Sequence, residues 1–106
     1  MLERDYQAHL IKVLRLRFPG CLILKNDSSY LQGILDLTIL YKDRWAMLEV
    51  KVSEKARRQP NQEYYVRMLN EMSYASFVYP ENEEEVLDGL QRTFEPRGLT
   101  RLSERQ

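Results

Sequence analysis

The stretch ILDLTILYKDRWAMLEVKV, residues 34–52, decides the fold. Two runs rich in Ile, Leu and Val, which are typical of β-strands, lie on either side of Lys42-Asp43. We interpret this pair as a two-residue hairpin turn, although it lacks the usual glycine. The pattern therefore predicts two antiparallel strands, over residues 34–41 and 44–52.

Three charged side chains interrupt these apolar runs, and each needs a reason because an unpaired charge inside a sheet is costly. Asp36 lies in the first run, and Glu49 and Lys51 lie in the second. Pairing outward from the turn brings Asp36 opposite Glu49, with their β-carbons roughly 5 Å apart. Lys51 follows Glu49 by two residues and therefore projects from the same face. We expect the three side chains to form one cluster.

The rest of the chain alternates between helical and strand patterns. The spacing of apolar residues and the breakers between them predict helices over 3–18, 62–72 and 81–92 and strands over 21–25 and 75–79. The resulting order, αβββαβα, predicts an α/β fold in which a mixed sheet of about four strands is flanked by helices. We expect one domain over residues 1–94 and a polar C-terminal tail over residues 95–106.

The charge of the chain is balanced in total but uneven along its length. Its 106 residues include 16 Lys and Arg and 16 Asp and Glu. Residues 1–58 carry 11 basic and 7 acidic side chains, whereas residues 59–106 carry 5 and 9. Such asymmetry is a hint of a nucleic acid or another anionic partner. The basic half contains the charged cluster.

Several classes of protein are excluded by composition. One cysteine and one histidine rule out a disulfide framework within the chain and a multi-thiolate or polyhistidine zinc site. The sequence lacks an apolar run of about 18 residues, so we expect no membrane partner. Its start, MLERDYQ, carries acids and lacks the apolar centre of a signal peptide. We therefore expect a cytoplasmic protein.

The charged cluster has the composition of a site for a hard divalent cation. Two carboxylates side by side repel each other at low dielectric, and a cation between them removes that repulsion. Oxygen ligands that leave positions open to water suit Mg²⁺ or Mn²⁺. Such an ion polarises a phosphate, lowers the pKa of a bound water and stabilises the leaving oxygen. The amine of Lys51 would orient or deprotonate that water, or stabilise charge on the phosphate.

The motif resembles that of a known superfamily. Asp36, twelve intervening residues and then Glu49-Val50-Lys51 are similar to the PD-(D/E)XK nucleases. The preceding helix, Gly33 just before the acid, and a following helix that begins with glutamine resemble the VRR-NUC branch, which includes small stand-alone phage enzymes. The resemblance covers roughly residues 3–80 and implies a restriction-endonuclease-like αβββαβ core. In a phage-encoded protein, the compartment would be the host cytoplasm.

The resemblance also implies a role for individual residues. Lys51 would be the catalytic lysine, and Gln62 would border the active site. The implied catalytic set is Asp36, Glu49, Lys51 and Gln62, and the implied metal ligands are Glu3, Asp36, Glu49 and the carbonyl of Val50. The sequence departs from the superfamily pattern at Leu35, where a proline is common.

Our sequence-based hypothesis is a Mg²⁺-dependent DNA endonuclease. By resemblance to junction-resolving relatives, its substrate would be branched DNA such as a four-way junction. Two symmetric incisions need two active sites, which predicts a homodimer. Basic and polar residues near the motif would bind DNA phosphates, since Lys and Arg supply most non-specific affinity. These candidates are Lys25, Ser28, Lys55, Arg57 and Arg58.

Other interpretations are compatible with the same residues. The three charged residues could form a structural ion-pair cluster on a solvent-facing sheet. The fold could bind nucleic acid without cutting it, or its basic half could dock an acidic protein. An acid in the first helical turn, as at Glu3, is favourable through the helix dipole alone. Gln62 could equally well cap its helix or contact solvent.

Overall fold

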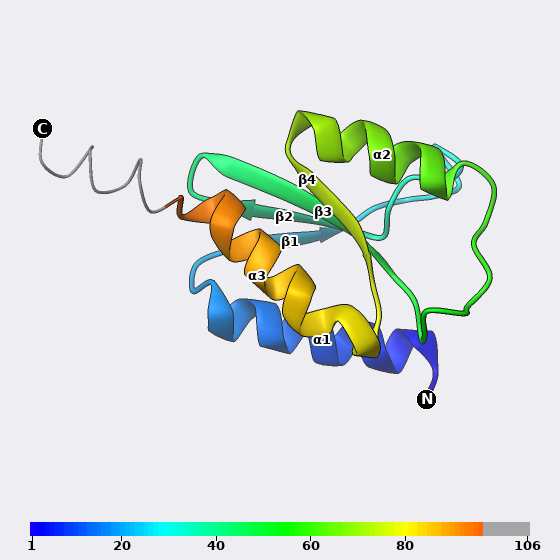
Figure 1. The fold of residues 1–106 in the computed structure, drawn as a ribbon, viewed down its shortest axis with the longest axis horizontal. Helices are drawn as coiled ribbons and strands as arrows, with labels where there is room; N and C mark the ends of the chain where they lie inside the picture. Colours follow the sequence, from blue (N-terminus) through cyan, green and yellow to red (C-terminus); the bar gives the residue numbers. More distant parts are fainter. Residues whose placement is uncertain (97–106) are drawn as a thin grey trace, which may run out of the picture.

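The computed structural model describes residues 1–96 as a four-stranded sheet with helices on both faces (Figure 1). The remaining residues of the expected tail, 97–106, lie outside the described part. The elements are α1 (Glu3–Arg17), β1 (Leu22–Lys25), β2 (Leu37–Tyr41), β3 (Arg44–Val50), α2 (Gln62–Met72), β4 (Tyr74–Val78), a 3₁₀ turn (Pro80–Asn82) and α3 (Glu83–Phe94). This order confirms the predicted α/β fold class with its αβββαβ-like core.

The strands lie in the sheet in chain order, β1-β2-β3-β4. The first two pairings are antiparallel, and β4 runs parallel to β3 because the chain returns through α2. The hairpin between β2 and β3 turns at Lys42-Asp43, as predicted, and Lys42 adopts the left-handed conformation with φ of 58°. The sheet is therefore mixed.

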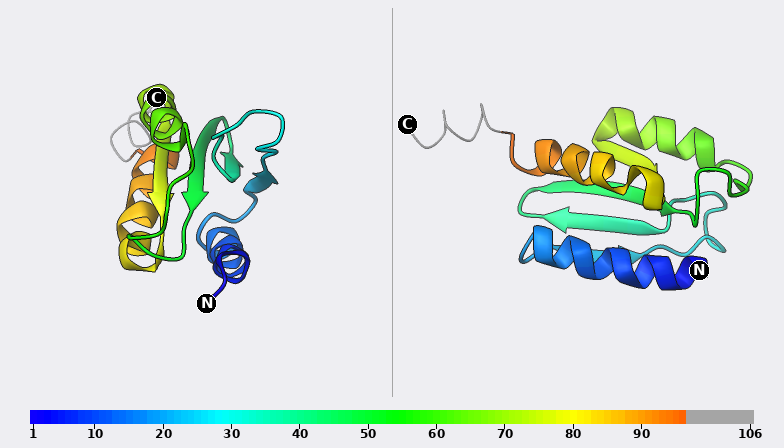
Figure 2. Two further views of the ribbon diagram at one scale, coloured as in Figure 1. Left: turned by 90° about the vertical axis from the view of Figure 1, so that its right-hand side faces the viewer. Right: turned by 60° about the horizontal axis from the view of Figure 1, so that its bottom comes forward.

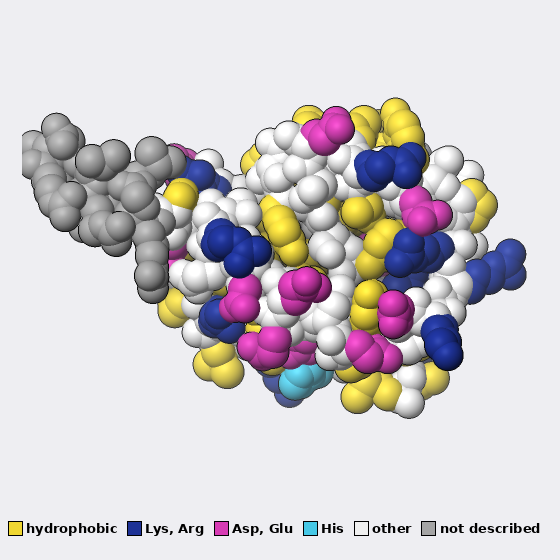
Figure 3. Space-filling view, in the orientation of Figure 1, with side chains coloured by type: hydrophobic (Ala, Val, Ile, Leu, Met, Phe, Trp, Pro, Cys, Tyr) yellow, Lys and Arg dark blue, Asp and Glu magenta, His cyan; other side chains and the backbone are white. Residues whose placement is uncertain are grey.

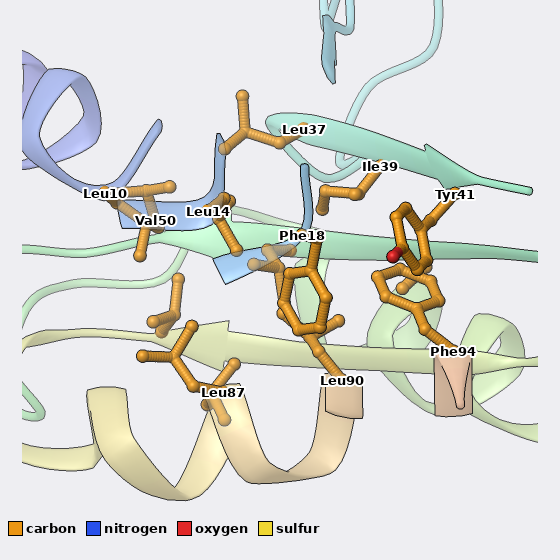
Figure 4. Packing of buried hydrophobic residues seen from close by; sticks show 14 of the residues in the cluster. Leu10, Leu14, Phe18, Leu37, Ile39, Tyr41, Val50, Leu87, Leu90 and Phe94 are labelled. Atoms are coloured by element: carbon orange, nitrogen blue, oxygen red, sulfur yellow. The ribbon is translucent and has the colours of Figure 1, made fainter. Parts of the chain in front are cut away.

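Two helices cover one face of the sheet and one helix covers part of the other. In the right-hand view of Figure 2, α1 and α3 lie together in front of the strands. Their buried apolar side chains form the main core with those of β2 and β3 (Figure 4). On the opposite face α2 packs on β3 and β4 through Leu69, which meets Leu35 and Ala75.

The apolar spacing in α1 explains its position. Tyr6, Leu10, Leu14 and Phe18 recur every four residues and are all buried, so one stripe of the helix faces the sheet. Phe18 closes the core at its far end, where its ring makes edge contacts with the rings of Tyr41 and Phe94. The opposite end, at the N-terminus of α1, is the end where the charged cluster lies.

The strand that was predicted over residues 34–41 begins later, at Leu37, so Asp36 lies just before β2. Leu37 pairs with Leu48, and continuing that register brings Asp36 opposite Glu49, as expected from the turn. The regular ladder nevertheless stops at Leu37. The physical reason is that the N–H of Asp36 and the N–H of Val50 donate to carboxylate side chains instead of to strand carbonyls.

None of the helices between residues 1 and 96 is both long enough and apolar enough to cross a membrane.

Candidate active site

The side chains of Asp36 and Glu49 each accept a hydrogen bond from the backbone of the opposite segment. The N–H of Asp36 donates to Oε1 of Glu49 at 3.1 Å, and the N–H of Val50 donates to Oδ2 of Asp36 at 2.9 Å. The side chain of Glu49 is only 2% exposed. These two backbone hydrogen bonds hold both carboxyl groups in a fixed orientation. Two acids separated by twelve residues thus become one rigid pair.

Lys51 lies beside this pair and is buried as well. Its backbone N–H continues the parallel pairing by donating to the carbonyl of Val78, although β3 formally ends at Val50. Its Nζ lies 3.6 Å from Oε2 of Glu49 and donates to the carbonyl of Arg57 at 3.0 Å. Lys51 is 6% exposed. The cluster is therefore an enclosed site and not a set of ion pairs on a solvent-facing sheet.

Gln62 connects the first turn of α2 to the carboxylates. Its Nε2 donates to Oε2 of Glu49 at 2.8 Å, and its Oε1 accepts from the N–H of Gln59 at 2.8 Å. Gln62 is buried. Because both ends of the amide are used, its orientation is determined by the network. Gln62 holds Glu49 from the side opposite Asp36 and does not merely cap its helix.

Two loops meet behind this network at Gly33. A β-carbon at Gly33 would lie 2.5 Å from Cβ of Asn61 and 2.8 Å from the carbonyl oxygen of Pro60. Asn61 itself is in the left-handed conformation, with φ of 72°, and directly precedes Gln62. The contact is possible because glycine has no side chain. The loop before Asp36 therefore supports the loop that positions Gln62.

Burial dominates the electrostatics of the pair. It raises the pKa of Glu49 from its ordinary value of 4.5 to about 8; the negative charge of Asp36 adds to the rise and the positive charge of Lys51 opposes it. Burial also raises the pKa of Asp36, against a backbone hydrogen bond from Val50 and the charge of Lys51. In the absence of a cation the pair therefore retains a proton at pH values where an exposed carboxyl has lost it.

This shift predicts how stability depends on pH in the metal-free protein. Glu49 titrates near 4.5 in the unfolded chain and near 8 in the folded one, so between these values the folded chain holds a proton that the unfolded chain has released. The contribution of Glu49 to the free energy of unfolding should therefore fall as pH rises from about 5 to about 8. Urea unfolding in the presence of a chelator, at about pH 5 and at about pH 8, measures this fall in the free energy of unfolding.

A matched pair of variants isolates this contribution. Glu49→Gln should flatten the fall in stability between the two pH values, because its side chain does not titrate. Glu84→Gln makes the same change on the exposed surface of α3 and should keep the wild-type slope. An unchanged slope in Glu49→Gln would show that burial does not perturb the carboxyl in this way.

Asp36 and Glu49 supply some of the oxygen ligands that a divalent cation needs. The two are adjacent hard oxygen donors, and a cation between them would offset the charge of Asp36, which adds to the rise that burial causes in the pKa of Glu49. Glu3 lies at the start of α1, and most of its surface is exposed. The partial burial of its carboxyl raises its pKa, and the charges of Lys51 and Asp36 lie near enough to lower and to raise that pKa, respectively. Within residues 1–96, however, His, Cys, Asp and Glu side chains do not gather in a group of three around one point. Glu3 and the carbonyl of Val50 remain predicted ligands.

The five predicted DNA-binding residues are all exposed, and three of them lie in the loop between β3 and α2. Figure 3 shows Lys and Arg side chains gathered at that end of the molecule. Arg58 is already engaged, since its guanidinium lies 3.8 Å from the centroid of the Phe77 ring and its Nη1 is 2.9 Å from Oε2 of Glu63. Arg57 contributes a backbone carbonyl to Lys51. The same loop therefore holds Lys51 through a backbone carbonyl and places basic side chains around the site.

Some functional groups could not be recognised from the sequence. The N–H of Gln59 and the carbonyl of Arg57 complete the site through the main chain, which carries no residue-specific signal. Sequence patterns also gave no indication that Tyr30 is a surface residue, although it is 90% exposed. The left-handed Asn61 had a usable signal, because asparagine after Pro60 is one of the few residues that adopt this conformation readily.

Comparisons with protein-family models, with curated proteins and with solved structures each return no match.

Proposed function

We propose that this protein is a metal-dependent DNA endonuclease that hydrolyses phosphodiester bonds with a PD-(D/E)XK-type site of the VRR-NUC kind. The observation that carries the proposal is the interlocked pair of Asp36 and Glu49 with the buried amine of Lys51 at 3.6 Å. Buried carboxyl groups whose pKa values are raised by burial and by a neighbouring charge, as at Glu49, are typical of functional sites.

The proposed metal is Mg²⁺ or Mn²⁺, held by Asp36 and Glu49, with Glu3 and the carbonyl of Val50 as further ligands. When bound, the ion would polarise the scissile phosphate and supply a water of lowered pKa. A bound cation would also favour the ionised form of both acids, against the burial that raises their pKa values.

The chain's own residues would position the reaction. Gln62 holds Glu49 by the 2.8 Å bond to Oε2, which leaves the carboxylate one orientation. Lys51 is held by the Arg57 carbonyl and retains donor capacity, because an ammonium group has three N–H donors. Its role is to orient the attacking water or to stabilise charge on the phosphate oxygens.

Exposed Lys and Arg side chains lie on the side of the site where DNA would bind. Lys55, Arg57 and Arg58 lie on the loop next to Lys51, where they would bind phosphates flanking the scissile bond, and Lys25 and Ser28 would extend this surface. One domain of this size offers little DNA-binding surface, so we propose that the protein works as a homodimer on branched DNA, in the cytoplasm.

A second candidate is a nucleic-acid-binding module that does not cut. It is favoured by one observation, namely that both oxygens of Glu49 and the amine of Lys51 already have partners within the protein. A network that satisfies itself in this way would also stabilise a fold that only binds DNA.

A cleavage panel tests the two candidates together. Labelled four-way junction, flap, duplex and single-stranded DNA are incubated with the protein and Mg²⁺ or Mn²⁺. We expect incision that depends on the metal, is lost with a chelator and is lost in Asp36→Asn. Binding without incision in either metal would favour the second candidate. The absence of DNA affinity at low salt would contradict both and favour a protein-interaction domain.

A further inference from the structure

A pocket lies next to the carboxylate pair on the same face of the sheet. It has a volume of about 370 Å³, at the small end of the range for ligand sites. Four apolar or aromatic side chains and two polar ones surround it: Tyr30, Leu31, Ile34, Met47, Asn26 and Asp27. An apolar lining with a few hydrogen-bonding groups is the usual composition of a pocket for a small planar ligand.

The register of the strands places this pocket close to the proposed reaction centre. Met47 precedes Glu49 by two residues, so both project from the same face of β3, about 7 Å apart. Asn26 joins the pocket to the other acid, because its N–H donates to the carbonyl of Asp36 and its Nδ2 donates to the carbonyl of Leu35. A ligand in the pocket would therefore lie within one or two nucleotides of a phosphate held at the acids.

The most exposed side chain of the lining is held on a rigid loop. Oδ1 of Asp27 accepts from both the N–H and the Oγ of Ser29, at 2.9 and 2.6 Å. The backbone carbonyl of Asp27 accepts from the N–H of Tyr30 at 3.2 Å. The loop thus uses its own hydrogen bonds to present a ring that is 90% exposed. An exposed tyrosine ring is an effective surface for stacking a base.

We propose that this pocket binds one unpaired nucleobase of the DNA substrate, with the ring of Tyr30 stacked on it. The inference rests on the proposed endonuclease function, because it names the part of the DNA that the enzyme would hold beside the scissile phosphate. It deepens that function by requiring a nucleotide free of base pairing next to the cut. A base inside a continuous duplex is paired and stacked on its neighbours, so it would have to be unpaired and unstacked before it could enter the pocket.

The same sheet face has a competing feature. Leu22, Leu24 and Leu40 are exposed on β1 and β2, where α2 does not reach, and a second copy of the chain could cover them. The pocket differs from this strip because its lining combines an aromatic ring with the amide of Asn26 and the carboxylate of Asp27. The amide of Asn26 already bonds the Leu35 carbonyl and the Thr38 hydroxyl, so contacts with the edge of a base fall to the carboxylate of Asp27, whereas the strip has only apolar surface.

The test compares two DNA ligands that differ in one base. A labelled duplex carries a single-stranded arm with either a thymine or an abasic site at the first unpaired position, and fluorescence anisotropy is read with a chelator present so that no cleavage occurs. We expect the full-length protein to prefer the thymine by about 5- to 150-fold, the range set by stacking on an aromatic side chain. Tyr30→Ala should abolish the preference, and Tyr30→Phe should retain it because stacking does not need the hydroxyl.

A matched control variant and three outcomes that would overturn the inference complete the test. Tyr64→Ala removes another exposed aromatic ring, outside the pocket, and should keep the preference for thymine. Equal binding of the two ligands by the wild-type protein, or an unchanged preference in Tyr30→Ala, would overturn the inference. So would weaker self-association of Tyr30→Ala in sedimentation without any change in DNA affinity, since that would assign the pocket to an interface between copies.

The cleavage panel separates failure of this inference from failure of the proposed function. Metal-dependent incision by a protein that does not distinguish thymine from the abasic site would overturn the inference alone. A preference for thymine that Tyr30→Ala abolishes, in a protein that cuts no substrate, would support the pocket and contradict the endonuclease.

Discussion

Replacing Lys51 with methionine is expected to lower the rate of Mg²⁺-dependent DNA cleavage by about 10²- to 10⁴-fold. Methionine keeps most of the aliphatic length, so the change removes the charge and the donors more than the packing. The amine lies 3.6 Å from Glu49 and is 3.0 Å from the Arg57 carbonyl, and it is buried, so bulk water cannot replace it easily. Single-turnover cleavage with saturating enzyme measures the chemical step without the binding step.

The control for this prediction is Lys12→Met, the same substitution on the exposed surface of α1. It should cleave at the wild-type rate. DNA affinity in the presence of a chelator should be nearly equal in the two variants, since each removes one positive charge. If the Lys51→Met protein is folded and cuts DNA as fast as Lys12→Met, Lys51 takes no part in the reaction.

Replacing Gly33 with alanine should destabilise the protein and impair the site, whereas the same change at Gly20 should destabilise it less and leave the site intact. Both glycines have positive φ, 92° and 89°, so alanine introduces about 1–2 kcal/mol of backbone strain at either. A new β-carbon at Gly20 meets no atom of the described residues within 4 Å, but at Gly33 it would meet Asn61 and the Pro60 carbonyl at 2.5–2.8 Å. Overpacking of this kind costs a further ~1–3 kcal/mol.

The difference between the two glycine variants is therefore the informative quantity. Urea unfolding should show Gly33→Ala to be less stable than Gly20→Ala by that overpacking cost. Cleavage by Gly33→Ala should also fall, by up to about 10²-fold, because a shift of Asn61 displaces Gln62 and through it Glu49. Equal stability of the two variants would mean that the loop relaxes away from Asn61, and the proposed support of Gln62 would be wrong.

Much of the fold follows from local patterns. The turn at Lys42-Asp43 sets the hairpin register, so the approach of Asp36 to Glu49 follows from the spacing of residues around that turn. The boundaries of α2 were also predictable, because the polar loop before Gln62 and the apolar stripe after it are both visible in the sequence. These predictions succeed because neighbours in the chain supply the interactions that define them.

Other features depend on contacts between distant residues. Met72 follows Leu69 at helical spacing, yet it is 66% exposed as the last residue of α2. The start of β2 was placed three residues too early, since side-chain carboxylates take the backbone donors that a longer ladder would use. Helical and strand periodicity carries no information about such side-chain bonds.

The sequence by itself determined the α/β class, the hairpin and the pairing of Asp36 with Glu49, because hydrophobic period and turn chemistry are local. Only the tertiary structure decided that Lys51 is buried against the Arg57 carbonyl, that Gln62 holds Glu49, and that Tyr30 borders a pocket beside the acids. The physical reason is that these contacts form where two loops, 26–36 and 53–61, meet at the carboxyl end of β3. Loop conformation there is set by main-chain hydrogen bonds and by the close approach at Gly33, which residue types alone do not specify.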